Sequence, residues 1–455
     1  MISRLYVQSD NYMERREFIV GIDLGTSKIA AVAGVKDTLG FITVLAVEQE
    51  PSGGCIRRGC VYNVEEAAGK IKRVINKLEN KLSPNKIAKV YVGVGGQSLR
   101  SVDHRVSVDF DGENVITQSI VQSLEQEARQ YQPEMLELLD VVYPRYEING
   151  KPERTPIGVM ASEIAVDYKL IVARPSLKRN IARAVTEKAG YRIAGYFVSP
   201  LALADFTLTE NEKDLGCALI DFGAGTTTLS IYKGGVLRHL IAIPFGGQLL
   251  TKDITRLNIV EAEAEQMKIR SGRMGGLVDQ PDQLVGGAGQ DLKLSELSAV
   301  IDARVNELIE NIVSQIDKSG FYRSINAGIV LAGEASSLRG LAAVLVQKAG
   351  CNVRVADSRN ISAGNNGEVH SMAYLQALSI MTLGKENCGD EAKAVQSPIS
   401  GRPVAQPVSS STSKKRKERP EKKGPGLFGK FKEGIGNITN NLSNNLFDNV
   451  EEEEE

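Results

Sequence analysis

Two stretches of the chain share one pattern of apolar and polar positions. Residues 18–33 read FIVGIDLGTSKIAAVA and residues 217–232 read CALIDFGAGTTTLSIY. Each stretch has an apolar run that ends in aspartate, a corner rich in Gly, Ser or Thr, and a second apolar run. This pattern predicts a β-hairpin with a polar tip. Its repetition in both halves of the chain indicates two related halves that close on one ligand.

The apolar periodicity elsewhere predicts alternating strands and helices, and therefore an α/β fold of two domains. The first half continues with a strand at 41–47, a helix at 64–82, a strand-rich insert at 85–165, and then strand 168–173, helix 176–189, strand 192–198 and helix 199–210. The second half continues with strand 236–244, helices 247–256 and 260–270, a long amphipathic helix at 295–318, strand 328–332 and helix 336–349.

The chain ends in a segment of different character. Residues 387–424 predict a disordered linker, within which residues 414–423 (KKRKERPEKK) carry seven Lys or Arg against two Glu. Residues 425–450 predict an amphipathic helix of about 20 residues, ~30 Å long. Its apolar stripe includes Leu427, Phe428, Phe431, Ile435, Ile438, Leu442, Leu446 and Phe447.

Two interpretations of this helix compete, namely a terminal helix docked on its own domain and an anchor lying in the membrane plane. The flexible linker and the many Gly and Asn of the helix favour the anchor, because such a helix is weakly stable alone. The basic run beside it would be attracted to anionic lipid. The final Glu451–Glu455 run would be repelled by such lipid and limit insertion, or it is a plain solubilising tail.

Composition narrows the alternatives further. The 455 residues are 42% hydrophobic and 24% charged, which is enough for two domains with cores. A net charge of −1 gives no overall attraction to nucleic acid. The five cysteines form no C-x-x-C pair and predict free thiols rather than a metal or disulfide site. Residues 1–16 are polar and predict a disordered extension, with Met13 as an alternative start.

Both hairpin tips suit a polyphosphate group. Glycines let the backbone approach phosphate oxygens, and backbone N–H groups and hydroxyls supply donors. The expected phosphate-binding residues are Gly25, Thr26, Ser27, Gly223, Gly225, Thr226 and Thr227. Asp23 and Asp221 are expected to hold Mg²⁺ through water, since Mg²⁺ prefers oxygen ligands and retains its hydration shell.

These motifs resemble those of the actin/Hsp70-type ATPase superfamily. Residues 23–28 (DLGTSK) and 221–227 (DFGAGTT) match its two phosphate motifs, and residues 330–335 (VLAGEA) match its adenosine segment. The resemblance implies an actin-like, ribonuclease H-type fold. Within the superfamily the chain is similar to the FtsA family of bacterial division proteins. The reason is the place of the strand-rich insert at 85–165, which follows helix 64–82 instead of preceding it. The pilus proteins of the PilM type share this order.

The resemblance also implies details of the nucleotide site. Gly333 would lie at the adenosine, and Glu265 and Lys268 match a segment that reaches the ribose and base, although an i,i+3 surface ion pair is the alternative. Lys28 is either a phosphate-binding cation or solvent-facing. Glu334 replaces the second glycine of the adenosine turn, which would weaken affinity or reorient the base. No base for an attacking water is identified, so we expect ATP binding with slow hydrolysis, below about 1 s⁻¹.

The same resemblance divides the chain into subdomains. They are 1A at 17–84 and 166–200, 1C at 85–165, 2A at 201–245 and 326–386, and 2B at 246–325.

The implied function is that of an ATP-binding adaptor that polymerises and tethers FtsZ filaments to the cytoplasmic face of the inner membrane at the division site. Subdomain 2B would receive the C-terminal peptide of FtsZ, and subdomain 1C would meet later division proteins. Arg304 and Glu307 match a family signature in 2B, where they either face the partner or form a structural ion pair. A PilM-like pilus-assembly role, an Hsp70-type ATPase and a sugar kinase are the alternatives.

Overall fold

The computed structural model describes residues 17–37, 40–274, 284–285, 292–358, 361–363 and 371–390. The predicted extension at 1–16, the linker beyond residue 390, the amphipathic helix at 425–450 and the acidic run at 451–455 lie outside these residues. Within the described part, no helix is both long and apolar enough to cross a membrane.

One sheet is built from the first half of the chain. In spatial order its strands are β11 (Arg192–Val198), β6 (Lys89–Val94), β1 (Ile19–Leu24), β2 (Lys28–Lys36), β3 (Ile42–Pro51) and β19 (Ile361–Ala363). The first hairpin forms as predicted, with β1 and β2 antiparallel and Asp23 opposite Ala30 near its tip. β6 and β11 add in parallel on the other side of β1.

Two helices pack against this sheet. α1 (Val64–Lys81) begins at Asn63, whose side chain accepts a hydrogen bond from the Glu66 backbone N–H. Its apolar face is buried against β2 and β3. α10 (Leu375–Leu383) is apolar on nearly all sides and packs on β1, β2 and the crossing helix α4 (Ser199–Thr207). α4 therefore carries the chain from β11 of the first half to the second half, and α10 packs against α4 on the first sheet.

A second sheet combines the second half of the chain with the insert. In spatial order its strands are β18 (Val353–Val355), β17 (Gly328–Ala332), β12 (Cys217–Phe222), β13 (Thr227–Lys233), β14 (Val236–Ile243), β7 (Arg100–Val115), β10 (Met160–Ala173), β8 (Glu137–Ile148) and β9 (Lys151–Glu153). The second hairpin, β12 with β13, places Asp221 opposite Thr228 as the sequence pattern predicts.

The insert differs from its predicted limits of 85–165. β6, within those limits, pairs with β1 and β11 and so belongs to the first sheet. β10 runs on to Ala173, paired with β7, past the predicted end. The sequence pattern missed both limits because β6 is buried on both faces and β10 is one uninterrupted strand. β7 also pairs with β14 at Arg100 and Ile241, which joins the insert to the second sheet.

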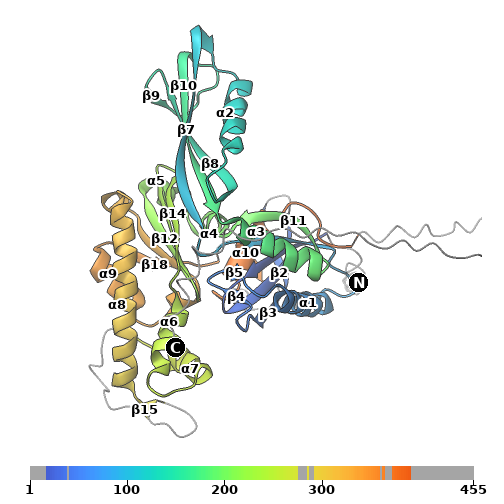
Figure 1. The fold of residues 1–455 in the computed structure, drawn as a ribbon, viewed down its shortest axis with the longest axis vertical. Coiled ribbons are helices and arrows are strands. Elements are labelled where there is room, and N and C mark those ends of the chain that lie inside the picture. Colours follow the sequence, from blue (N-terminus) through green and yellow to red (C-terminus); the bar gives the residue numbers. More distant parts are fainter. Residues whose placement is uncertain are drawn as a thin grey trace, which may run out of the picture. The chain divides into compact units, whose positions relative to one another are not determined.

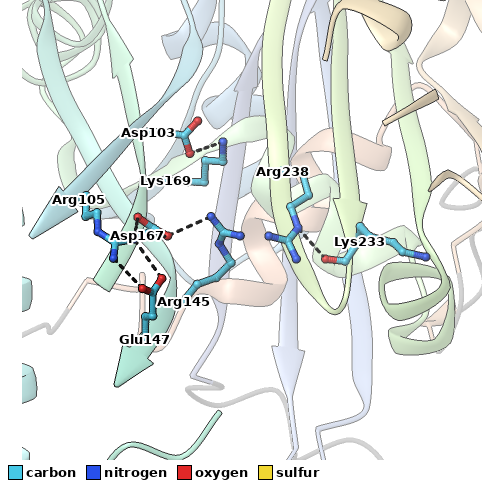
Figure 2. A network of polar contacts seen from close by, with 8 residues as sticks. All are labelled: Asp103, Arg105, Arg145, Glu147, Asp167, Lys169, Lys233 and Arg238. Atoms are coloured by element: carbon cyan, nitrogen blue, oxygen red, sulfur yellow. Dashed lines mark hydrogen bonds and ion pairs between the residues drawn. The ribbon is translucent and has the colours of Figure 1, made fainter. Parts of the chain in front are cut away.

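The two faces of the insert's sheet differ in polarity. One face packs its apolar residues against α2 (Gln118–Gln130). The other carries cross-strand ion pairs: Asp167 accepts hydrogen bonds from Arg105 at 3.3 Å and Arg145 at 3.2 Å, as Figure 2 shows. Figure 2 also shows the guanidinium of Arg238, from β14, beside that of Arg145. Apolar and charged side chains therefore alternate along the strands, which explains why the sequence pattern predicts strands for the insert.

Helices cover the second sheet. α8 (Leu294–Lys318) forms over almost the predicted range and buries a stripe of Leu, Ile and Val side chains (Figure 1). The other helices of this half are α5 (Glu210–Leu215), α6 (Gly247–Thr255), α7 (Glu261–Ser271) and α9 (Leu341–Ala349). The first half adds α3 (Pro175–Ala182), which continues as a π-helical turn at Arg183–Lys188.

One ion pair in this half stabilises the fold in a pH-dependent way. Glu212 forms the capping box of α5 with Thr209, and its two carboxylate oxygens accept hydrogen bonds from Arg354 of β18 at 2.6 and 2.8 Å. These hydrogen bonds lower the pKa of Glu212 to about 2. Because the folded-state pKa is lowered, the stabilisation is complete above the unfolded pKa of about 4.5 and is lost as the pH falls towards 2.

We therefore expect Glu212→Gln to lower the free energy of unfolding by about 2–3 kcal/mol at pH 7. The difference in the free energy of unfolding between this variant and wild type should become smaller as the pH falls below about 4.5. Urea denaturation between pH 3.5 and pH 7 measures it. Glu310→Gln is the control, because Glu310 pairs with Lys348 with 67% of its side chain exposed, and should cost little at any pH. A pH-independent loss in Glu212→Gln would contradict the charge argument.

Candidate functional site

The two hairpin tips face one cleft. The tip between β1 and β2 and the tip between β12 and β13 form its walls, together with the turn after β17. Ten of the predicted nucleotide-site residues line it: Asp23, Gly25, Thr26, Ser27, Lys28, Asp221, Gly223, Gly225, Thr226 and Gly333. The structure therefore brings together residues that are far apart in the sequence.

Close packing holds the tips together. A Cβ atom on Gly225 would lie 2.5 Å from Thr26 Oγ1 of the opposite hairpin. That hydroxyl oxygen accepts a hydrogen bond from the Gly59 backbone N–H at 3.0 Å. The Ser52 hydroxyl donates to the Gly25 carbonyl oxygen at 2.6 Å. Only a glycine at position 225 permits this approach of the two hairpins.

The carboxyl groups of the two aspartates at the hairpin tips have raised pKa values. Burial, and then the charge of Asp221, raise the pKa of Asp23 to about 7. Burial raises the pKa of Asp221 to about 6. A divalent cation would relieve both effects, because it neutralises two neighbouring carboxylates with little direct dehydration when water lies between. The donor set of two hard carboxylate oxygens facing a polar cleft therefore fits hydrated Mg²⁺.

Thr227 does not line this cleft, in contrast to its predicted role. It is the first residue of β13 and is 1% exposed, and its hydroxyl donates to the Phe245 carbonyl oxygen at 2.8 Å. Because side chains alternate along a strand, the next residue, Thr228, lines the cleft instead. The motif located the hairpin tip, but the structure turns the Thr227 hydroxyl away from the cleft.

A second cavity adjoins the first and shares Ser27, Ala224 and Glu334 with it. Glu265 and Lys268 of α7 line this cavity. Lys268 Nζ also donates to Glu265 at 2.7 Å and to Thr251 Oγ1 at 2.9 Å. The pair is therefore an i,i+3 ion pair that also forms one wall of a cavity beside the cleft between the hairpin tips, and its contact with a nucleotide stays a prediction. Apolar and cationic residues of the same wall include Leu250, Ile269, Leu338 and Arg339.

Sequence reasoning missed the rear wall of the cleft. Gln376 of α10 lines it and donates from Nε2 to the Ser199 carbonyl oxygen at 2.9 Å. Its buried Oε1 has no hydrogen-bond partner in the described part of the chain. No motif marks this residue, which shares a mainly apolar helix with Ser379 and Thr382. Gly95 and Gly96 also line the cleft, and a pair of glycines directly after an apolar run is a signal that the sequence does contain.

Lys28 and Arg304, two of the predicted site residues, form ion pairs in the structure. Lys28 lies in the cleft with 17% of its side chain exposed and contacts the Glu334 carboxylate. Arg304 of α8 donates to Glu307 at 2.6 Å and to Asp253 of α6 at 3.2 Å. The structural alternative therefore describes Arg304, whose charge is already balanced within its own subdomain.

Comparison with known proteins places these features in one family. The family model described as "Cell division protein FtsA" matches residues 218–379, and that described as "SHS2 domain inserted in FTSA" matches residues 96–172. The second range agrees with the limits of the insert given by strand pairing.

Curated relatives support the same assignment. The cell division protein FtsA of Porphyromonas gingivalis is 35% identical over 71% of this chain and 69% of its own length. That of Neisseria meningitidis is 30% identical over 72% and 81%. That of Escherichia coli K12 is 28% identical over 82% and 91%. Among solved structures, a PilM–PilN type IV pilus biogenesis complex has a TM-score of 0.56 at 18% identity, covering 80% of this chain and 97% of that chain.

Proposed function

Because the chain belongs to the FtsA family of cell division proteins and has an actin-like fold, we propose that it is an ATP-binding adaptor that tethers FtsZ filaments to the membrane. The observation that carries the proposal is the meeting of both hairpin tips at one cleft, in a chain whose sequence ends in a basic and amphipathic tail.

The cleft supports nucleotide binding through complementary parts. Backbone N–H groups and hydroxyls at Gly25, Thr26 and Gly225 would hold the phosphates, and the cavity beside Glu265 and Lys268 would take the ribose and base. Asp23 and Asp221 would hold Mg²⁺ through water. The bound metal supplies charge neutralisation for the phosphates.

Slow hydrolysis is the expected behaviour of this site. A rapid ATPase needs a group that orients an attacking water. Gln376 lines the cleft, but its unpaired Oε1 is buried, and a neutral amide cannot remove a proton from a water. ATP would therefore act mainly as a ligand that stabilises the closed arrangement and filament contacts, with turnover below about 1 s⁻¹.

The tail supports attachment to the cytoplasmic face of the inner membrane at the division site. An apolar stripe in residues 425–447 would enter the lipid interface, and the basic run at 414–423 would be drawn to anionic headgroups. Polymerisation, with contacts that include the insert, would combine many weak anchors into stable attachment.

The partner sites follow from the same proposal. Subdomain 2B would receive the C-terminal peptide of FtsZ, and the insert would meet later division proteins. Arg304 is unsuited to direct contact, since Asp253 and Glu307 already neutralise it. We expect it to maintain the shape of 2B rather than to bind the peptide.

Co-sedimentation with liposomes tests the tether. Purified FtsZ, the chain and vesicles containing anionic lipid are centrifuged with ATP, and the intact chain is compared with one that ends after Lys423. We expect only the intact chain to carry FtsZ into the pellet, and more efficiently with ATP. Vesicles of neutral lipid are the control for the basic run. If FtsZ is never recruited while a pilus-protein N-terminal peptide binds, a PilM-like role replaces this one.

The acidic end gives a second test of the anchor. Deleting residues 451–455 removes five carboxylates that anionic lipid repels. We expect tighter binding to anionic vesicles at low salt and a smaller difference at high salt. Unchanged binding at low salt would assign the run a solubilising role only.

A further inference from the structure

One ion pair spans the phosphate cleft. Lys28 is the first residue of β2, in the first sheet, and Glu334 is the first residue of the 3₁₀ turn after β17, in the second. The ammonium group of Lys28 contacts the Glu334 carboxylate, and both side chains line the cleft. The pair therefore connects the two halves of the chain across the space assigned to the ligand.

The two members differ in their surroundings. Lys28 has 17% of its side chain exposed, whereas Glu334 has 48% exposed. Among the described residues, Glu334 contacts no second cation. Glu334 also adds negative charge to a cleft that already contains Asp23 and Asp221, and Lys28 counters it: the charge of Lys28 lowers the pKa of Asp23, and that of Glu334 raises it. The balance of charge in the cleft thus depends on one lysine.

A triphosphate would disturb this balance. It brings several negative charges to the tip where Lys28 lies, and Lys28 is the cation that they would attract. If Lys28 turns to the phosphates, Glu334 loses its partner and faces the same phosphates as a like charge. If Lys28 stays with Glu334, the phosphates lose a cation. Either arrangement costs binding free energy that a neutral residue at position 334 would not cost.

We propose that Glu334 is an internal competitor for the phosphate-binding lysine, and that the Lys28–Glu334 pair closes the cleft in the nucleotide-free protein and must open for a nucleoside triphosphate to bind. This inference rests on the proposed nucleotide function. It assigns Glu334 the role of setting the affinity for nucleotide. Because the ion pair lowers this affinity, the fraction of sites occupied responds to changes in nucleotide concentration at which a high-affinity site would stay saturated.

Nucleotide titration of Glu334→Gln tests the proposal. Glutamine keeps the size of the side chain and removes its charge. By calorimetry or with a fluorescent ATP analogue, with Mg²⁺ present, we expect ATP to bind about tenfold more tightly than to wild type. Adenosine, which lacks phosphates, should bind equally to both proteins. Weaker ATP binding by Glu334→Gln would overturn the proposal, because the carboxylate would then assist the ligand.

A double-mutant cycle tests whether the effect passes through Lys28. Lys28→Gln alone should weaken ATP binding, and Glu334→Gln in that background should lose most of its tenfold effect. A full tenfold effect without Lys28 would show simple repulsion and refute the competition.

A matched pair elsewhere supplies the control. Lys89 and Glu386 form a contact of similar exposure, 17% and 58%, and neither residue lines the cleft. Glu386→Gln should leave ATP affinity unchanged. If wild type binds no nucleotide at all, the proposed function fails. If wild type binds and Glu334→Gln binds equally well, only the competition fails.

Discussion

Replacing Gly225 by valine is expected to abolish nucleotide binding while the protein remains folded. A Cβ atom at this position would lie 2.5 Å from Thr26 Oγ1, 2.8 Å from Thr26 Cγ2 and 3.0 Å from the backbone Cα of Arg58. Valine adds two methyl groups beyond that atom, so the hairpin tips must separate. Because both tips must contact one polyphosphate, we expect at least a hundredfold loss of ATP affinity, which corresponds to about 2.7 kcal/mol.

Equilibrium titration with an ATP analogue measures this loss, and circular dichroism with thermal melting checks that the fold persists. Gly69→Ala is the control, since Gly69 lies in α1 and an added Cβ would meet only Arg73 Nη1, at 3.8 Å. It should bind ATP as wild type does. Retained affinity in a folded Gly225→Val protein would show that the two tips do not hold the same ligand.

The cleft between the hairpin tips was accessible to sequence reasoning because its motifs are local. A hairpin fixes which residues flank its tip, so the positions of Asp23 and Asp221 follow from the apolar runs around them. The repeated pattern then implied that two tips meet. The amphipathic stripe of α8 was equally accessible, because a helix over 25 residues repeats its period many times.

Other parts of the site depend on contacts that no local pattern encodes. Gln376 reaches the cleft because α10 packs beside α4, and the residues that it joins are 177 positions apart. The Lys28–Glu334 contact joins residues 306 positions apart. The side of β13 to which Thr227 points depends on where the strand begins, and element boundaries are the least certain part of sequence interpretation.

The insert also shows the difference between what a local sequence pattern predicts and what only tertiary contacts determine. Alternating polar and apolar residues identified its sheet, whose charged face appears in Figure 2. The assignment of β6 to the first sheet needed the tertiary structure, because a strand buried on both faces has no period to distinguish it.

Replacing Gly21 by alanine should produce the largest loss of stability among single-methyl changes to the first sheet. A Cβ atom on Gly21 would lie 2.5 Å from the Ala377 carbonyl oxygen and 2.6 Å from the Met381 backbone nitrogen, both in α10. These are backbone atoms of a helix and cannot rotate away, so α10 must move off β1. We expect the free energy of unfolding to fall by about 3 kcal/mol, at the upper end of overpacking costs, as measured by urea denaturation.

Gly195→Ala separates this clash from the general cost of adding a methyl group to the sheet. Gly195 lies in β11 of the same sheet, and its added Cβ would meet the ring of Tyr91 at 3.1 Å. A side chain can shift by a few tenths of an ångström, so we expect a loss below about 1 kcal/mol. Equal losses at the two positions would mean that α10 adapts as readily as a side chain. Because α10 also carries Gln376, that adaptability would make the rear wall of the cleft movable rather than fixed.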